Sequence, residues 1–266
     1  MQHRNIQFGK DTVTKTSEPR LMRIEVEKTR RAYEIGKNSG LFHVPEVLEY
    51  DEVNGVAVFK LIKHIHPVRS AMDGSLRYKS LMEQIGRSLA VIHRKLTLPH
   101  GMTITLPSEF NLPGTEVFLH GDFNGMNICV SPCLPPIVIL DWQTTAVHGG
   151  QATYGSRYFD LIWFVNYMLW TPTFYYLFCD PVSKAARCFL ESYFKESEFP
   201  YDAEMIARYA KLFFETEQPF RKQNAHWSNR YLLPRSRLLT QRFVESLKTI
   251  TIDGPNPHDN NQIKKG

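Results

Sequence analysis

The sequence HGDFNGMN at residues 120–127, followed by DW at residues 141–142, decides the fold of this chain. Two short apolar runs lie between these motifs, at 127–130 and 137–140. The turn sequence Ser-Pro-Cys-Leu-Pro-Pro separates them. Apolar runs on either side of a Pro-rich turn predict a β-hairpin. The polar residues of both motifs are therefore expected at one end of that hairpin.

Three oxygen-bearing side chains are expected to lie close together at this end of the predicted hairpin. Asn127 begins the first predicted strand, Asp141 ends the second one fourteen residues later, and Asp122 lies in the preceding loop. Amide and carboxylate oxygens suit Mg²⁺, which takes one or two protein ligands together with substrate phosphates. A carboxylate such as Asp122 can accept a proton from an attacking hydroxyl. A His-Gly-Asp alone would be a turn and an Asp-Trp alone a strand end, so the joint spacing carries the prediction.

This pattern resembles the aminoglycoside phosphotransferase and choline kinase branch of the protein-kinase-like fold. Residues 85–93, 157–161 and 189–193 resemble further segments of that family, and the resemblance spans roughly residues 12–215. It implies an α+β, two-lobed protein-kinase-like fold with a reduced N-terminal lobe and a mainly helical C-terminal lobe. It also implies ATP and Mg²⁺ as cofactors.

The resemblance assigns roles to the individual residues. Asp122 stands where protein kinases have their catalytic base, and Asn127 and Asp141 stand where they have the magnesium ligands. His120 and Asp160 are implied to be structural supports of the loop rather than reactants. His93 is interpreted as a packed, hydrogen-bonded helix residue.

The N-terminal part carries the signals of a small lobe, placed at residues 1–65. They are a strand at 12–16, a helix over roughly 20–37 with Gly40 beyond it, and a hairpin with runs at 47–50 and 56–62. Helical periodicity begins at Arg77 and returns over residues 158–248, with a buried core helix expected from Leu161 to Trp170. This predicts a catalytic and acceptor-binding lobe at 66–251, followed by a disordered tail at 252–266.

ATP needs a cation from the small lobe, and Lys15 on the predicted strand is the candidate. Glu25 and Glu27 are the two possible partners on the following helix, about 200° apart around its axis. Glu25 shares the apolar face and is therefore chosen. Lys60 to Ile62 fall where the family has its hinge, so backbone groups of Lys60 and Ile62 are expected to bind the adenine edge.

The segment before Lys15 departs from the family pattern. Only fourteen residues precede Lys15, with Gly9 as the single glycine. The phosphate-covering loop is therefore expected to be shortened or missing, unless the chain start is truncated. The preference for ATP over GTP stays open for the same reason.

Composition limits the classes of partner. The 266 residues carry a formal charge of +5, short of the clustered excess of a nucleic-acid binder. Between 226 and 248 five bases face only Glu245, which indicates a solvated helix face or a weak attraction to an anionic substrate or membrane surface. Four cysteines without paired ligand spacing give no zinc site, and no segment reads as a signal peptide or a membrane span, so a cytoplasmic location is expected.

Three functions compete at this point. The first is an ATP- and magnesium-dependent phosphotransferase acting on a hydroxyl of a small molecule or saccharide. The second is a non-catalytic kinase-like nucleotide-binding module, which would be expected to lack one of Lys15, Asp122, Asn127 or Asp141. The third is a protein kinase, for which the eighteen residues between Asp141 and Asp160 leave little room for an activation segment.

The acceptor is not identified by the sequence. Residues 161–225 hold eight acids and seven bases, which does not predict the strongly acidic pocket that a polycationic aminoglycoside needs. A sugar, a lipopolysaccharide-type saccharide or another metabolite hydroxyl stays equally open. Four aromatic residues are interpreted either as a sugar-stacking platform or as packed helix residues: Trp163, Trp170, Tyr175 and Tyr176. The oligomeric state is not indicated.

Overall fold

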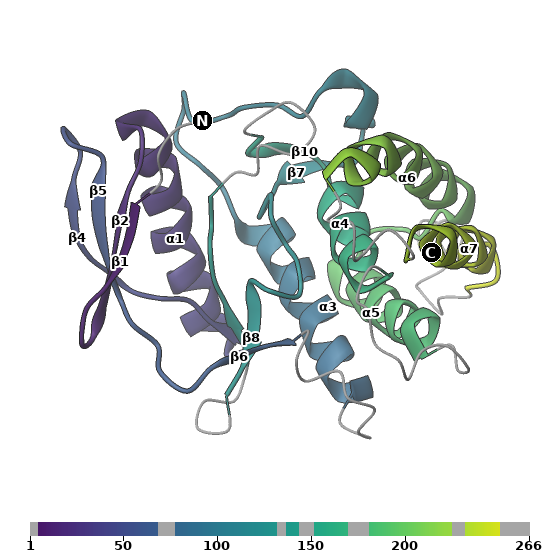
Figure 1. Cartoon of the computed structure of the whole chain (residues 1–266), viewed down its shortest axis with the longest axis horizontal. Helices are drawn as coiled ribbons and strands as arrows, with labels where there is room; N and C mark the ends of the chain where they lie inside the picture. The colour runs from purple at the N-terminus through teal and green to yellow at the C-terminus, as the bar shows by residue number, and fades with distance from the viewer. Residues whose placement is uncertain are drawn as a thin grey trace, which may run out of the picture.

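Two lobes make up the chain in the computed structural model (Figure 1). The structure describes residues 5–68, 78–131, 137–143, 152–169, 181–224 and 232–250. The smaller lobe combines an antiparallel sheet with helix α1, and the larger lobe is mainly helical (Figure 1). The predicted α+β architecture with a small N-terminal lobe is therefore confirmed.

The sheet of the small lobe has four strands in the order β1-β2-β5-β4. Their bounds are β1 Asn5–Phe8, β2 Thr12–Thr16, β4 Val47–Asp51 and β5 Val56–Lys60. The strand at 12–16 and the 47–62 hairpin are where the sequence predicted them. The structure adds β1 as a separate edge strand. All four of its residues are exposed, so it lacks the alternation between buried and exposed residues that marks a strand.

Helix α1, Pro19–Ser39, lies against this sheet. Proline opens the helix, and Gly40 ends it in the left-handed conformation with φ 66°, as the sequence signals indicated. One stripe of the helix packs on the inner face of the sheet through a small core of Met22, Val26, Ala57 and Phe59. This packing fixes which side chains of α1 point inward.

A second four-stranded sheet runs in the order β3-β9-β8-β6. Its strands are β3 Phe42–His43, β6 His66–Pro67, β8 Ile128–Val130 and β9 Ile137–Ile139. The antiparallel β8–β9 pair is the hairpin predicted from the deciding motif. Strand β3, from the predicted residues 1–65, pairs in parallel with β9. Chain on both sides of the predicted lobe boundary thus contributes to one sheet.

Five helices form the larger part of the C-terminal lobe within the described residues. They are α3 Tyr78–Lys95, α4 Tyr158–Leu169, α5 Pro181–Ser197, α6 Ala203–Asn224 and α7 Leu232–Leu247. A 3-10 turn η1 Ser108–Phe110 and the paired strands β7 Glu116–Phe118 and β10 Tyr154–Ser156 complete the lobe. Helix α4 is buried at every position except Tyr167, as expected of the predicted core helix.

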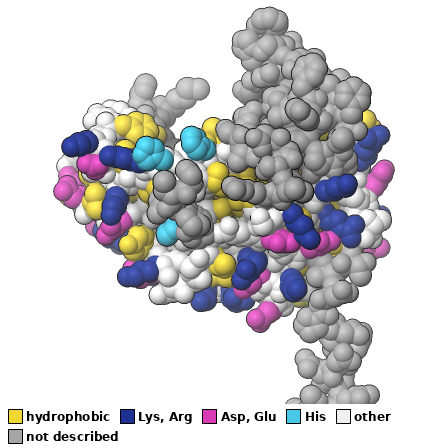
Figure 2. All heavy atoms as spheres, turned by 90° about the horizontal axis from the view of Figure 1, so that it is seen from below, with side chains coloured by type: hydrophobic (Ala, Val, Ile, Leu, Met, Phe, Trp, Pro, Cys, Tyr) yellow, Lys and Arg dark blue, Asp and Glu magenta, His cyan; other side chains and the backbone are white. Residues whose placement is uncertain are grey.

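The described surface is mixed in charge. Figure 2 shows Lys and Arg side chains interspersed with Asp and Glu side chains on the face seen from below. Arg237, Arg242 and Lys248 of the late basic segment are exposed. None of the described helices is long and apolar enough to cross a membrane. Trp170, Tyr175, Tyr176, Cys133 and the predicted tail lie outside the described residues.

Helices α3 and α5 pack closely because Gly86 faces the backbone of α5. A Cβ at this position would collide with the carbonyl oxygen of Phe189. Gly86→Ala should therefore lower the free energy of unfolding by about 1–3 kcal/mol, since overpacking outweighs the better helix propensity of alanine. Urea denaturation measures this. Lys95→Ala, an exposed change on the same helix, is the control and should stay within about 0.5 kcal/mol of wild type; equal stability of both variants would contradict the packing argument.

Candidate active site

Asp160, at the start of α4, organises the loop that carries the deciding motif. Its Oδ2 accepts the backbone N–H of His120 at 2.7 Å and its Oδ1 accepts that of Gly121 at 2.9 Å. His93 of α3 contacts Oδ2 through Nε2 at 3.0 Å. Asp160 is fully buried, which alone would raise its pKa, but these donors lower the pKa below the usual range. The carboxylate is therefore ionised, and it fixes the loop by accepting the backbone N–H groups of His120 and Gly121.

His120 connects the loop to the end of strand β9. Its Nε2 lies 3.1 Å from the carbonyl oxygen of Leu140, and its Nδ1 accepts the backbone N–H of Asp122 at 3.2 Å. The ring contacts Trp142 with centroids 4.5 Å apart. Burial, together with the nearby Lys28 charge, lowers the pKa of His120 to about 4. A neutral ring with both nitrogens engaged is positioned as a structural support.

Lys28 of α1 is a residue of this region that sequence reasoning missed. It is completely buried, and its Nζ donates to the backbone carbonyl of His120 at 2.6 Å. Burial lowers its pKa to about 8, although surrounding carboxylates favour the charged form. A signal was present, because Glu25, Lys28 and Ala32 follow the i, i+3, i+7 spacing of one helix face. A lysine on an inward face needs a buried partner.

Asp122 projects from the same loop and accepts three side-chain hydrogen bonds. Asn124 and Trp163 donate to Oδ1 at 2.7 and 2.9 Å, and Asn127 donates to Oδ2 at 2.9 Å. Burial raises the pKa of Asp122 above its usual value, the charge of Asp141 acts in the same direction, and the three donors oppose the shift. The result is a half-buried carboxylate with raised proton affinity and a fixed orientation.

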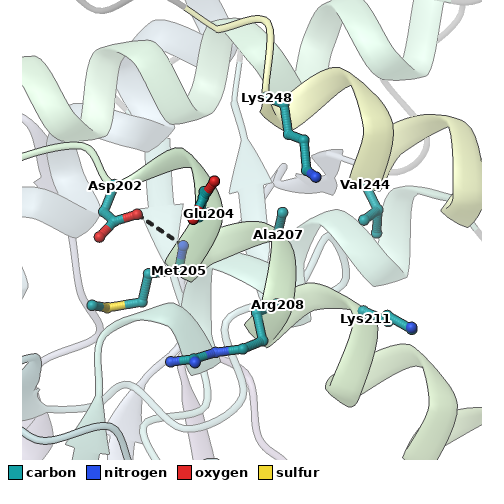
Figure 3. Close-up of a pocket in the computed structure, with 8 residues that line it drawn as sticks. All are labelled: Asp202, Glu204, Met205, Ala207, Arg208, Lys211, Val244 and Lys248. Carbon is teal, nitrogen blue, oxygen red and sulfur yellow. Dashed lines mark hydrogen bonds between the residues drawn. The ribbon is translucent and has the colours of Figure 1, made fainter.

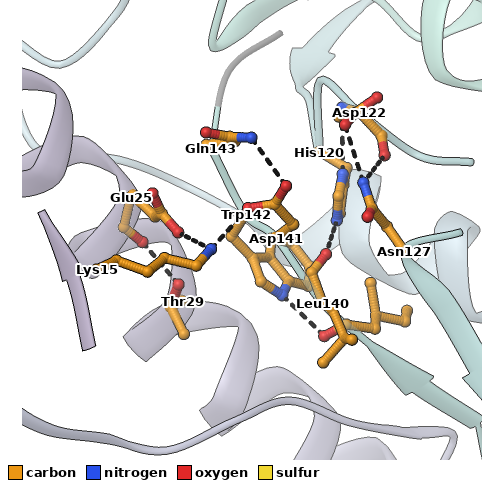
Figure 4. A network of polar contacts seen from close by, with 11 residues as sticks. Lys15, Glu25, Thr29, His120, Asp122, Asn127, Leu140, Asp141, Trp142 and Gln143 are labelled. Atoms are coloured by element: carbon orange, nitrogen blue, oxygen red, sulfur yellow. Dashed lines mark hydrogen bonds and ion pairs between the residues drawn. The ribbon is translucent and has the colours of Figure 1, made fainter. Parts of the chain in front are cut away.

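Lys15 bridges two carboxylates from different parts of the chain (Figure 4). Its Nζ lies 2.6 Å from Oε1 of Glu25 on α1 and 2.7 Å from Oδ1 of Asp141, which follows β9. Burial opposes the charge of Lys15, but the two carboxylates outweigh it and raise its pKa. Asp141 has a left-handed backbone with φ 58°, uncommon outside glycine, and Gln143 donates to its Oδ2 at 2.8 Å.

The ion pair predicted between Lys15 and Glu25 is present, and the helix-face argument that chose Glu25 holds. Glu25 is 3% exposed, because it lies on the stripe of α1 that faces the sheet. Glu27 lies on the outer side, where it pairs with Arg31 at 2.6 Å. Lys15 and Glu25 are thus brought together with Asp141, while Asn127 lies with Asp122.

The predicted hinge is only partly open to a ligand. The backbone N–H of Lys60 donates to the backbone carbonyl oxygen of Glu46 at 2.9 Å. The backbone N–H of Leu61 donates to the backbone carbonyl oxygen of Asp11 at 2.9 Å. The N–H of Ile62 makes no hydrogen bond with the rest of the described chain. The backbone N–H of Lys60 is therefore not available to a ligand, because it already forms a hydrogen bond within the small lobe. The N–H of Ile62 can still donate to one.

The donor set fits a hard divalent cation. Asn127 turns its amide nitrogen to Asp122, and its Oδ1 makes no hydrogen bond to any described residue. Together with the carboxylate of Asp141 this offers oxygen ligands of the type Mg²⁺ takes beside nucleotide phosphates. No group of three or more His, Cys, Asp or Glu side chains suited to a metal occurs among the described residues. A metal here would depend on phosphate oxygens as well.

A separate groove lies between α6 and α7, away from these residues (Figure 3). Lysine and arginine side chains line it together with acidic ones, and Asp202 accepts the backbone N–H of Met205 at 2.9 Å. None of the predicted site residues contributes to it. The catalytic candidates are therefore those gathered at the end of the β8–β9 hairpin.

Comparison with solved structures relates this arrangement to known folds. A choline/ethanolamine kinase family protein from Mesorhizobium loti aligns over 94% of this chain and 92% of its own, with TM-score 0.53 and 13% identity. A microcompartment-associated aminopropanol kinase aligns over 93% and 94%, with TM-score 0.57 and 13% identity. An amicoumacin kinase aligns over 97% and 91%, with TM-score 0.53 and 12% identity.

The chain has a protein-kinase-like fold. No family model matches the sequence, and no curated protein matches it. At such low identity the similarity shows the fold alone, and the chemistry of the site depends on its own residues. Within the kinase-like fold, residues far apart in sequence meet at the end of one hairpin: Lys15, Glu25, Asp122, Asn127 and Asp141.

The two glutamates of α1 give a matched stability test. Glu25→Ala removes a buried partner of Lys15 and should lower the free energy of unfolding by about 3 kcal/mol. Glu27→Ala removes only a helix-surface pair and should cost about 0.5 kcal/mol or less. Chemical denaturation of both variants decides it. A Glu27→Ala variant that loses as much stability as Glu25→Ala would show that the inward face of α1 is assigned wrongly.

Lys28 predicts a pH dependence of stability. Its folded pKa of about 8 lies below the ordinary value of 10.5, so the unfolded chain binds more protons between these pH values. The free energy of unfolding contributed by Lys28 should therefore rise as pH increases through this window, by up to about 3 kcal/mol. Lys28→Met should lose this rise, and the difference between wild type and variant, measured by denaturation at several pH values, reports it.

The control for this measurement is Lys37→Met, an exposed change on the same helix. It should follow the wild-type curve, because the remaining titratable groups are shared by all three proteins. Parallel curves for wild type and Lys28→Met would mean that the buried lysine does not resist protonation.

Proposed function

We propose that this protein is an ATP- and magnesium-dependent phosphotransferase that moves the γ-phosphate of ATP to a hydroxyl of a small molecule or saccharide. The observation that carries the proposal is the half-buried Asp122 carboxylate, held by three donors beside the Lys15–Asp141 pair. A carboxylate of raised pKa suits proton acceptance, and the adjacent charges suit a phosphate.

The small lobe provides the nucleotide contacts in this proposal. Lys15 neutralises phosphate charge, and Glu25 keeps the ammonium oriented from α1. Strand register places Ile6 opposite Lys15 and Phe8 opposite Val13, on one face of the sheet. Ile6 and Phe8 are 43% and 75% exposed, so they offer apolar surface on which a base can stack. The open N–H of Ile62 is suited to the adenine edge.

The large lobe provides the chemistry. Asn127 and Asp141 would hold Mg²⁺, which offsets the charge of the β- and γ-phosphates when bound. Asp122 accepts the proton of the acceptor hydroxyl while its own position is fixed by the loop. His120 and Asp160 hold that loop and do not exchange protons, because one is a neutral buried ring and the other a buried carboxylate of lowered pKa that accepts three hydrogen bonds. Transfer then depends mainly on positioning and charge neutralisation.

The kinases of similar fold support the donor and the class of acceptor by analogy. The amicoumacin kinase was solved with AMP-PNP, Ca²⁺ and amicoumacin, which supports nucleotide use by this fold by analogy. The aminopropanol and choline/ethanolamine kinases support a small hydroxyl compound as acceptor in the same way. A cytoplasmic location accompanies this proposal, since the nucleotide donor is an intracellular metabolite.

The two carboxylates should respond differently to substitution. Asp122→Asn should leave Mg²⁺–ATP binding nearly intact while turnover falls about 10²-fold or more, the usual scale for a general base. Asp141→Asn should weaken metal-dependent nucleotide binding and turnover together. The measurements are calorimetry with Mg²⁺–ATP and ATP consumption over a panel of aminoglycosides, sugars, choline-like alcohols and saccharides.

Asp51→Asn is the matched control, because Asp51 is an exposed carboxylate at the end of β4 in the small lobe. It should behave like wild type in both measurements. Full turnover by Asp122→Asn on a true acceptor would refute the role of that residue. No Mg²⁺–ATP binding and no turnover with any acceptor would refute the proposed function itself.

A further inference from the structure

Trp163 of α4 contacts the candidate base directly, although its ring lies in the core. The indole N–H donates to Oδ1 of Asp122 at 2.9 Å. The ring is stacked parallel to Phe159 with centroids 6.1 Å apart, and it meets the edge of Phe213 at 5.9 Å. Only 9% of the residue is exposed. Such a ring cannot serve as an open stacking platform for a sugar. Its polar contact is the hydrogen bond from its N–H to Asp122.

The three hydrogen-bond donors are distributed unequally over the two carboxylate oxygens of Asp122. Asn124 and Trp163 both donate to Oδ1, at 2.7 and 2.9 Å, whereas Asn127 alone donates to Oδ2, at 2.9 Å. Each carboxylate oxygen has two lone-pair directions. Both lone-pair directions of Oδ1 are therefore occupied by donors, and Oδ2 has one lone-pair direction left to accept a further hydrogen bond. An approaching hydroxyl finds its acceptor only at Oδ2.

We propose that Trp163 is a positioning residue that occupies Oδ1 of Asp122, so that Oδ2 is the oxygen that takes the acceptor proton. The proposal deepens the phosphotransferase function and rests on it. In the step, the acceptor O–H bond breaks and its proton binds to Oδ2. The acceptor oxygen forms a bond to the γ-phosphorus, and the bond from that phosphorus to the bridging oxygen breaks, releasing ADP. The Asp122 carboxylic acid later returns its proton to water.

Helix α4 can position Asp122 because it contacts both the backbone of the loop and the Asp122 side chain. Asp160 at its first turn holds the loop backbone through the N–H groups of His120 and Gly121. Trp163 lies three residues later, on the same side of the helix, and holds the side chain of Asp122. The indole stacks on Phe159, one turn earlier on the same helix, so the direction of its N–H is set by α4 itself, and Phe213 only meets its edge. Backbone and carboxylate are thereby oriented by one rigid element.

The variant that tests this is Trp163→Phe, which keeps an aromatic ring in the core and removes the N–H together with part of the indole volume. The control is Phe213→Leu, which loosens the packing of Trp163 without touching the carboxylate. The first readout is a ¹³C NMR titration of the aspartate carboxyl groups, with the Asp122 signal assigned by its absence in Asp122→Asn. This measurement needs neither acceptor nor turnover. Thermal denaturation of each variant checks that it is folded.

The N–H of Trp163 favours the ionised carboxylate, so removing it should move the Asp122 midpoint to higher pH. Phe213→Leu should leave that midpoint where it is. With an acceptor from the panel, Trp163→Phe should lower kcat about tenfold, shift the acid limb of the kcat profile to higher pH, and leave KM for ATP unchanged. These results together support the positioning role.

Other outcomes separate the two proposals. An unmoved midpoint in folded Trp163→Phe overturns the role of Trp163, whatever happens to turnover. Equal losses of kcat in Trp163→Phe and Phe213→Leu overturn it too, because packing alone would then explain both. A shifted midpoint in a protein whose wild type phosphorylates nothing supports the contact and refutes the phosphotransferase function instead.

Discussion

The buried carboxylate of Asp160 is the constraint on which the site depends. A loop that enters the core must satisfy its backbone N–H groups, and Asp160 accepts two of them, from His120 and Gly121. His93 completes the network from α3. Because Gly121 has φ 88°, the chain can turn sharply here and aim Asp122 at the end of the hairpin. Asp160 thereby fixes the loop that carries Asp122 relative to helix α4.

Charge from the small lobe balances this concentration of carboxylates. Lys15 pairs with Glu25 and Asp141, and Lys28 donates to the carbonyl of His120. Both lysines belong to the small lobe, so its electrostatics are linked to the loop of the large lobe. A buried ion pair contributes less to net stability than to fixing one arrangement, since desolvation offsets much of the attraction. The arrangement fixed here places the ammonium of Lys15 between the carboxylates of Glu25 and Asp141.

Much of this could be predicted because the signals are local. The motif at 120–127 with Asp141 indicates a hairpin, the proline and Gly40 mark the ends of α1, and helix periodicity separates Glu25 from Glu27. The strands that were missed have weaker local signals. Strand β3 has two residues and pairs with β9 about ninety-five positions later, and β1 is exposed at every residue. Pairing of that kind depends on the partner strand and not on the segment itself.

The sequence by itself determined the residue types and spacings from which a site can be built: a carboxylate and an amide five residues apart, a second carboxylate beyond a hairpin, and a lysine on a strand before an amphipathic helix. Local propensity and periodicity act over a few residues, so these features are independent of the rest of the chain. Only the tertiary structure decided which donors meet Asp122, that Trp163 turns its N–H to Oδ1, and that Lys28 is buried against the loop. Those contacts join residues up to ninety-two positions apart, and packing of whole helices and sheets, not any local rule, brings them within hydrogen-bond distance.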